Sequence, residues 1–255
     1  MILIPVVDIK GGRVVHARGG NRRAYLPVVS RLCTGSAPGD VMDGFLGLFP
    51  FSIVYVADLD AIEGDGDNLE TVRDLAIRFP AVELWVDCGV RHKSACARWL
   101  DAGCEALVLG SESQQSVETA ADLLADRRKG RMILSLDFRD DGFIGPAQLL
   151  ARPEIWPRRV IAMTLGRIGG NMGPDLDRLR WLIGTAPGKK IFAAGGVRGI
   201  DDLTALSGLG ASGVLLASAL HDGRIGRHEI KRLSRPRNAT GRPFGNDGAD
   251  QRRSR

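Results

Sequence analysis

The feature of this 255-residue sequence that most constrains its fold is an internal repeat of about half its length. The tripeptide Gly89-Val-Arg91 returns as Gly196-Val-Arg198, an offset of 107 residues, and Gly103 returns as Gly210 at the same offset. Each half contains four apolar runs of strand length, each followed by a helical stretch. A repeat of this size predicts a single (β/α)8 (TIM) barrel with pseudo-twofold half-barrels and not a doubly wound sheet.

The expected strands are the apolar runs at residues 2–7, 53–57, 81–86, 105–109, 131–137 and 160–164, at 190–194 and, for the last, within 210–220. The first half has extra residues before its second strand, which we assign to a loop from Gly19 to Gly39. We expect Asp40 to cap a helix that runs to about Phe49. The domain prediction is one barrel over residues 1–232, followed by a disordered basic tail over 233–255.

The net charge of +5 comes mostly from that tail, because residues 235–255 contain six arginines and two aspartates. We expect the tail to be a solvated extension; nucleic-acid binding is the alternative that its charge leaves open. No apolar run is long enough to cross a membrane, and residues 1–7 lack the flanks of a signal peptide. We therefore expect a cytoplasmic protein without a membrane partner.

The four cysteines contain no CxxC pair and have no histidine at metal-ligand spacing. We therefore expect buried, reduced thiols, with no disulfide framework, no metal site and no cofactor. Cys88 follows the third expected strand. We predict that it faces the barrel mouth and is more accessible to a thiol reagent than Cys96 or Cys104.

The last two expected strands both end in small residues, at Gly195-Gly196 and at Ala217-Ser218. Small residues let backbone N–H groups approach an anion closely, and the exits of strands 7 and 8 form the phosphate site of many barrels. We predict that Gly195, Gly196, Ala217 and Ser218 bind a phosphate group. The alternative is a pair of ordinary strand-to-helix turns.

Several motifs resemble the half-barrel-repeat enzymes of histidine biosynthesis. This family comprises the phosphoribosylformimino-aminoimidazole-carboxamide ribotide isomerase and the cyclase subunit of imidazole glycerol phosphate synthase. The resemblance covers residues 1–232 and is most specific in the opening Val7-Asp8-Ile-Lys10-Gly-Gly-Arg-Val-Val15. Further matching segments are 56–60, 135–137, 194–197 and 217–220.

The resemblance implies an Amadori rearrangement, in which an aminoaldose phosphate becomes an aminoketose. One aspartate after strand 1 and one after strand 5 act as the acid–base pair in the isomerase, and these positions correspond to Asp8 and Asp137. It also implies that Thr164, after strand 6, hydrogen-bonds the substrate. A structural alternative for the two aspartates is ion pairing with Lys10 or Arg139.

The sequence departs from the family pattern in the first half, where Asp87-Cys88 and Ser111-Glu112 stand at the strand-3 and strand-4 exits. Carboxylates there would repel a second phosphate. The departures predict a diverged paralogue with one phosphate site and an acidic opposite end, at which Asp87 and Glu112 recognise an amine or another cationic group. We also expect Lys10 and Asp58 to contact the substrate.

The leading functional hypothesis is an isomerase-like enzyme that acts on a small phosphorylated sugar or amino-sugar derivative. One alternative is a lyase or synthase step in making a specialised cofactor, with Lys10 forming a Schiff base. Another is a non-catalytic phosphometabolite sensor or interaction subunit. The sequence leaves the substrate and the oligomeric state open.

Overall fold

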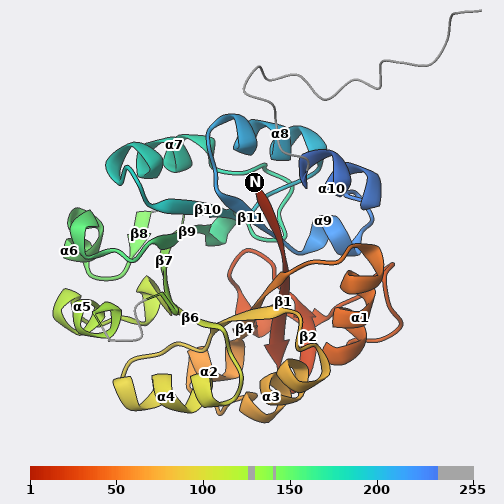
Figure 1. The fold of residues 1–255 in the computed structure, drawn as a ribbon, viewed down its shortest axis with the longest axis horizontal. Helices are drawn as coiled ribbons and strands as arrows, with labels where there is room; N and C mark the ends of the chain where they lie inside the picture. The colour runs from red at the N-terminus through yellow and green to blue at the C-terminus, as the bar shows by residue number, and fades with distance from the viewer. Residues whose placement is uncertain (126–129, 140–141, 235–255) are drawn as a thin grey trace, which may run out of the picture.

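The structure, a computed structural model, describes residues 1–125, 130–139 and 142–234. Within these residues, eight parallel strands close into a barrel, because β11 pairs with β1 as well as with β10 (Figure 1). In barrel order the strands are β1 (Ile2–Lys10), β4 (Ile53–Asp58), β5 (Glu83–Asp87), β6 (Ala106–Gly110), β7 (Met132–Arg139), β9 (Arg159–Thr164), β10 (Lys190–Ala194) and β11 (Gly213–Leu216). The predicted (β/α)8 barrel is confirmed.

Helices surround the barrel (Figure 1). The longer ones are α1 (Pro38–Leu48), α3 (Leu69–Arg78), α4 (Lys93–Asp101), α5 (Val117–Leu124), α7 (Leu176–Thr185), α8 (Ile200–Gly208) and α10 (Arg227–Ser234). The short helices and 3-10 turns are α2 (Leu59–Glu63), α6 (Ala147–Ala151), α9 (Ser218–His221), η1 (Arg22–Ala24), η2 (Ser111–Ser113), η3 (Pro153–Ile155) and η4 (Leu165–Arg167).

The start of α1 corrects one prediction. Its N-cap is Ala37, with Pro38 at the first helical position, so Asp40 lies inside the first turn and does not cap the helix. Proline fixes a helical φ angle and has no N–H to leave unsatisfied, which makes it well suited to this position. Asp40 still stabilises the positive end of the helix through its charge.

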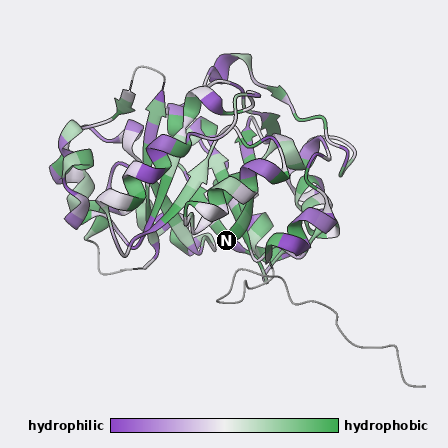
Figure 2. Cartoon of the chain, turned by 90° about the horizontal axis from the view of Figure 1, so that it is seen from above, coloured by the Kyte–Doolittle hydropathy of each residue, from purple (hydrophilic) through white to green (hydrophobic). Residues whose placement is uncertain are grey.

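Alternate strand residues divide the core into two parts. Residues such as Val7, Val56 and Val86 pack outward against the helices, while Tyr55 and Trp85 pack inside the barrel. The hydrophobic colour in Figure 2 accordingly concentrates on the central strands, and the surrounding helices show mixed polarity. Period-two alternation along each strand produces this division.

The two halves meet inside the barrel through equivalent aromatic residues. Trp85 on β5 and Phe192 on β10 are 107 residues apart, the offset of the repeat, and their rings make an edge contact with centroids separated by 5.1 Å. Arg159 places its guanidinium 5.0 Å from the centre of the Trp85 ring. These side chains fill the barrel interior below the site, so that the barrel is a packed core and not a channel.

Three short strands extend the barrel: β2 (Arg13–His16), β3 (Leu26–Pro27) and β8 (Gly142–Ile144). A turn at Gly11 and Gly12, both with positive φ, reverses β1 into β2. The segment that follows β2 crosses toward the loop after β9, where Gly19 N–H donates to the Ile168 carbonyl at 2.8 Å. This segment lies in the predicted Gly19–Gly39 loop.

The final described element, α10, ends at Ser234. Residues 235–255 of the predicted tail lie outside the described residues. None of the helices in the described ranges combines the length and apolar composition needed to span a bilayer.

Candidate active site

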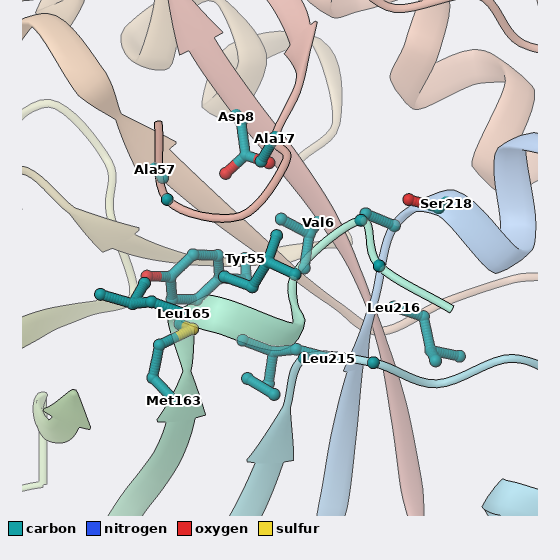
Figure 3. Close-up of a pocket in the computed structure, with 18 of the residues that line it drawn as sticks. Val6, Asp8, Ala17, Tyr55, Ala57, Met163, Leu165, Leu215, Leu216 and Ser218 are labelled. Carbon is teal, nitrogen blue, oxygen red and sulfur yellow. The ribbon is translucent and has the colours of Figure 1, made fainter. Parts of the chain in front are cut away.

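A pocket lies at the carboxyl ends of the barrel strands (Figure 3). Residues on or just after all eight strands contribute to its lining. Its polar groups include Asp8, Arg22, Tyr55, Asp87, Glu112, Asp137, Arg139, Ser218 and Arg224. Its apolar wall is formed by side chains such as Val6, Met163, Leu165, Ile168 and Leu215. The carboxyl ends of parallel strands converge in a closed barrel, which is why distant sequence positions meet here.

Asp8 and Asp137 belong to β1 and β7, which are separated by three strands in either direction around the barrel. Both line the pocket. The ion pairs with Lys10 and Arg139 that were the structural alternative are not found in the described residues. The two carboxylates therefore face the pocket from opposite walls.

Asp137 is held firmly by hydrogen bonds. Its Oδ2 accepts from Ser111 Oγ at 3.1 Å and from the Glu112 N–H at 3.0 Å, and its Oδ1 accepts from Ser135 Oγ at 2.6 Å. The pKa of Asp137 is nevertheless raised to about 7, because burial and, to a smaller extent, the Glu112 carboxylate outweigh the donors from Ser135 and Glu112. Desolvation is the dominant cause.

Asp8 has a different environment. No protein hydrogen bond to its carboxylate is found in the part of the chain that the structure describes. Burial raises the pKa of Asp8 to about 7; the Arg22 guanidinium opposes this shift, and the Asp87 carboxylate adds to it. The carboxylate is thus unrestrained and titrates near neutrality.

Asp87 lies between these two aspartates and is 7% exposed. Its Oδ2 accepts from the Tyr55 hydroxyl at 3.2 Å, and its Oδ1 accepts from the Gly89 N–H at 3.1 Å. A Cβ at Gly110 would lie 3.4 Å from Oδ2 of both Asp87 and Asp137, so these oxygens are no more than about 7 Å apart. Burial raises the pKa of Asp87 to about 6.

Glu112 also lines the pocket, but its charge is paired. Arg22, on the 3-10 turn η1 of the long loop, forms an ion pair with the Glu112 carboxylate. The Arg22 carbonyl in turn accepts from Lys10 Nζ at 3.2 Å. The loop thus brings a cation to the acidic side of the pocket.

The four residues predicted to bind phosphate are together in the pocket lining. Gly195 and Gly196 both have positive φ, and a Cβ at Gly196 would lie 2.2 Å from the Gly173 carbonyl oxygen. In the described residues, the N–H groups of Gly196, Ser218 and Ala219 donate to no protein acceptor. Glycine permits the close packing at Gly196, and the first N–H groups of α9 are unpaired because they begin the helix.

Other predicted substrate contacts lie outside the lining. Lys10 Nζ pairs with Glu63 at 2.8 Å, which removes the unpaired amine that a Schiff base needs. Asp58 is fully buried and accepts from the N–H groups of Ala61 and Asn68, as a helix cap. Thr164 is 4% exposed, and the period-two alternation of β9 brings its neighbours Met163 and Leu165 to the pocket instead.

The pocket and its surroundings contain residues that were not predicted, among them Arg22, Tyr55 and His16. Arg22 belongs to a segment without periodicity, which offered no signal. Tyr55 could have been found, because alternation along β4 directs residues 53, 55 and 57 inward. His16 places Nε2 2.9 Å from Ser218 Oγ, a contact between residues 202 positions apart that no local pattern reveals.

The prediction that Cys88 faces the barrel mouth is wrong. Cys88 is 5% exposed and packs in the outer core between strands and helices, because Asp87 is the residue directed inward at this exit. Cys96 and Cys104 are also buried, and only Cys33 is partly accessible among the four. All four cysteines are free thiols, and the predicted burial holds for all of them except Cys33.

The chain is similar to known proteins over most of its length. The model of the histidine biosynthesis protein family matches residues 2–226. An uncharacterized protein of Methanocaldococcus jannaschii is 27% identical over 235 residues, which cover 90% of this chain and 97% of the relative.

Relatives with a named activity are similar over the same length. The 1-(5-phosphoribosyl)-5-((5-phosphoribosylamino)methylideneamino) imidazole-4-carboxamide isomerase of Gemmatimonas aurantiaca is 31% identical over 234 residues, covering 88% of this chain and 94% of the relative. The isomerase of the same name from Syntrophomonas wolfei is 27% identical over 244 residues, 89% of this chain and 95% of the relative. The chain therefore belongs to the histidine biosynthesis protein family.

Proposed function

We propose that this protein is an isomerase that converts a small phosphorylated sugar or amino-sugar derivative from the aldose to the ketose form. Asp8 and Asp137 act as its acid–base pair. The observation that carries the proposal is the presence of two carboxylates, each with a pKa of about 7, on opposite walls of one pocket. Groups that titrate near the working pH are the most effective proton donors and acceptors.

Asp137 is assigned the acid role in the proposed reaction. It donates a proton to the ring oxygen of an aldosylamine while the C1–O bond breaks and the nitrogen lone pair forms a C1=N iminium. The donors that hold Asp137 fix its direction, and burial keeps it protonated in a part of the molecules at neutral pH.

Asp8 is assigned the base role. It takes the proton from C2, and the released electron pair forms a C1=C2 bond and neutralises the iminium nitrogen. Asp8, whose proton can exchange with water at this stage, then protonates C1, while the C2 hydroxyl proton returns to Asp137 as the carbonyl forms. Both carboxyl groups regain their starting states. Because no donor among the described residues holds the Asp8 carboxylate by a hydrogen bond, this side chain can reach both C2 and C1.

The phosphate of the substrate is proposed to bind at Gly195, Gly196, Ala217 and Ser218. The unpaired N–H groups at this end support the assignment. Arg224 also lines the pocket there, paired with Asp222 at 2.9 Å. Asp87 and Glu112 contact the opposite end of the substrate. Anchoring at one end holds C1 and C2 between the two aspartates without the anchor taking part in proton transfer.

The relatives support the reaction class. Those with a named activity are isomerases, and the name of their substrate contains phosphoribosyl groups. Retention of an aspartate at both exits disfavours the non-catalytic alternative, and the ion pair between Lys10 and Glu63 disfavours the Schiff-base lyase.

The test uses NMR to follow exchange of the C2 proton in D2O. The compounds tested are ribose 5-phosphate, glucosamine 6-phosphate and the substrate of the named relatives. We expect exchange with at least one of them, and a roughly 10²–10⁴-fold loss in both Asp8→Asn and Asp137→Asn. Phosphate affinity should stay within about twofold in both variants. Complementation of a strain that lacks the histidine-pathway isomerase then decides whether that reaction is the physiological one. Undiminished exchange in both variants would reject the acid–base pair.

A further inference from the structure

The two half-barrels carry equivalent strand exits whose donor groups are used differently. At the repeat offset of 107, Gly89 corresponds to Gly196 and Glu112 to Ala219. In the second half, the N–H groups of Gly196 and Ala219 have no protein acceptor in the described residues. In the first half, Gly89 N–H donates to Asp87 Oδ1 at 3.1 Å and Glu112 N–H donates to Asp137 Oδ2 at 3.0 Å.

The equivalent serines show the same contrast. Ser218 Oγ in the second half contacts His16 Nε2, a side chain that can supply a donor. Ser111 Oγ in the first half donates to Asp137 Oδ2 at 3.1 Å and lies 2.7 Å from the Ile144 carbonyl oxygen. The hydroxyl in the first half is therefore committed to oxygens of the protein.

We propose that the carboxyl groups of Asp87 and Asp137 occupy the half-barrel counterpart of the phosphate site, so that the substrate carries a single phosphate. This inference rests on the proposed function, whose substrate class it narrows. Asp87 is the specificity-determining residue of the pair, because Asp137 is also needed for proton transfer. Its carboxylate both takes the Gly89 donor and contributes negative charge where a second phosphate would lie.

The charges around this end agree with exclusion of an anion. Asp8, Asp87, Glu112 and Asp137 all line the pocket, and the Arg22 cation among them is already paired with Glu112. Arg139 also lines the pocket, but its guanidinium lies against Gly20 of the long loop, whose Cβ would be 3.8 Å from Arg139 Nε. Tyr55 donates to Asp87 and is thereby unavailable to a phosphate oxygen.

Binding of two related ligands tests the inference. Ribose 5-phosphate carries one phosphate, and the substrate of the named relatives carries two phosphoribosyl groups. By calorimetry at pH 7, we expect the second ligand to bind wild-type protein no more than tenfold tighter than the first. We expect Asp87→Gly to tighten binding of the two-phosphate ligand at least tenfold, without a comparable gain for ribose 5-phosphate. Asp43→Asn, at an exposed position paired with Arg78, is the matched loss of one negative charge and should change neither.

Inorganic phosphate provides a second measurement that is independent of ligand length and confirms that the variant is folded. We expect one phosphate per wild-type chain in a crystal soak, at the second-half exits, and a second one near Gly89 in the Asp87→Gly variant. Two phosphates in the wild type, or no gain in the variant, would overturn the inference alone. Absence of phosphate from the second-half exits as well would overturn the proposed phosphate anchor together with it.

Discussion

Asp137 accepts three hydrogen bonds from Ser111, Glu112 and Ser135, whereas Asp8, on the opposite wall of the same pocket, accepts none from the described residues. Both nevertheless have a pKa of about 7, because burial outweighs every other influence on each of them. One carboxyl group is therefore fixed in direction and the other can move, at nearly equal proton affinity. This difference underlies the assignment of acid and base.

We expect a bell-shaped dependence of kcat/KM on pH, with its maximum near 7. The acidic limb rises as Asp8 ionises and the alkaline limb falls as Asp137 loses its proton; because the groups interact, the apparent values belong to the pair. The measurement is C2 proton exchange between pH 5 and 9. A rate independent of pH across this range would contradict the assignment.

Two variants serve as controls for this profile. Arg22 lowers the pKa of Asp8, so Arg22→Met should move the acidic limb to higher pH. Glu112 raises the pKa of Asp137, so Glu112→Gln should move the alkaline limb to lower pH. Both variants should narrow the bell, from opposite sides.

We expect Asp8→Asn to raise the thermal stability at pH 8. The folded-state pKa of Asp8 is raised from 3.8 to about 7, so the folded protein binds more protons than the unfolded chain between these values. Stability from this group therefore falls as pH rises through that window and stays low above it. Allowing for partial solvent screening, the variant should gain roughly 1–3 kcal/mol at pH 8 and less at pH 5, measured by thermal melts. An equal gain at both pH values would show that ionisation is not the cause.

Gly196→Ala should destabilise the fold and weaken phosphate binding. The substituted Cβ would lie 2.2 Å from the Gly173 carbonyl oxygen, at a φ of +84° that residues other than glycine rarely adopt. We expect a loss of roughly 1–3 kcal/mol in unfolding free energy. Gly184→Ala is the matched control: it lies in α7, an added Cβ there would meet no atom within 4 Å, and the variant should gain about 0.5–1 kcal/mol from helix propensity. Equal melting temperatures of the two variants would contradict this account.

A thiol reagent should modify Cys33 first in the folded protein. Cys33 is partly exposed, whereas Cys88 and Cys104 are buried, and burial raises the pKa of Cys104 to about 12 and that of Cys88 well above its usual range. Mass spectrometry after brief labelling should find one modified residue, which Cys33→Ser abolishes. Rapid labelling at Cys88 would contradict its burial and agree with the prediction from the sequence.

The strand exits could be located from the sequence because buried parallel strands are continuous apolar runs, and the carboxyl ends of such runs converge in a closed barrel. Asp8, Asp87, Glu112 and Asp137 could therefore be assigned to one mouth from their positions in the chain alone. The direction of a side chain at a strand exit was harder to predict. Neighbouring residues point to opposite faces of the sheet, so that Cys88 is buried on the outer face while Asp87 points into the barrel.

Long-range partners were not predictable from the sequence. The ion pairs of Lys10 with Glu63 and of Arg22 with Glu112 depend on the path of an irregular loop, which carries no period in the sequence. The capping role of Asp58 was not predictable either, because a carboxylate at a strand end is compatible both with a pocket position and with capping of the next helix.

The hydrogen bonds from Gly89 to Asp87 and from Glu112 to Asp137 make the two ends of the mouth chemically unequal, although the two halves of the sequence repeat one another. A mouth with two equal ends would admit an elongated ligand in either direction, and reversal would present opposite faces of its reacting carbon to the base. A mouth with one end closed to anions admits it in one direction only. For the proposed reaction, we therefore expect the direction of binding, and with it the face of C2 that meets the base, to depend on backbone donors that never touch that carbon.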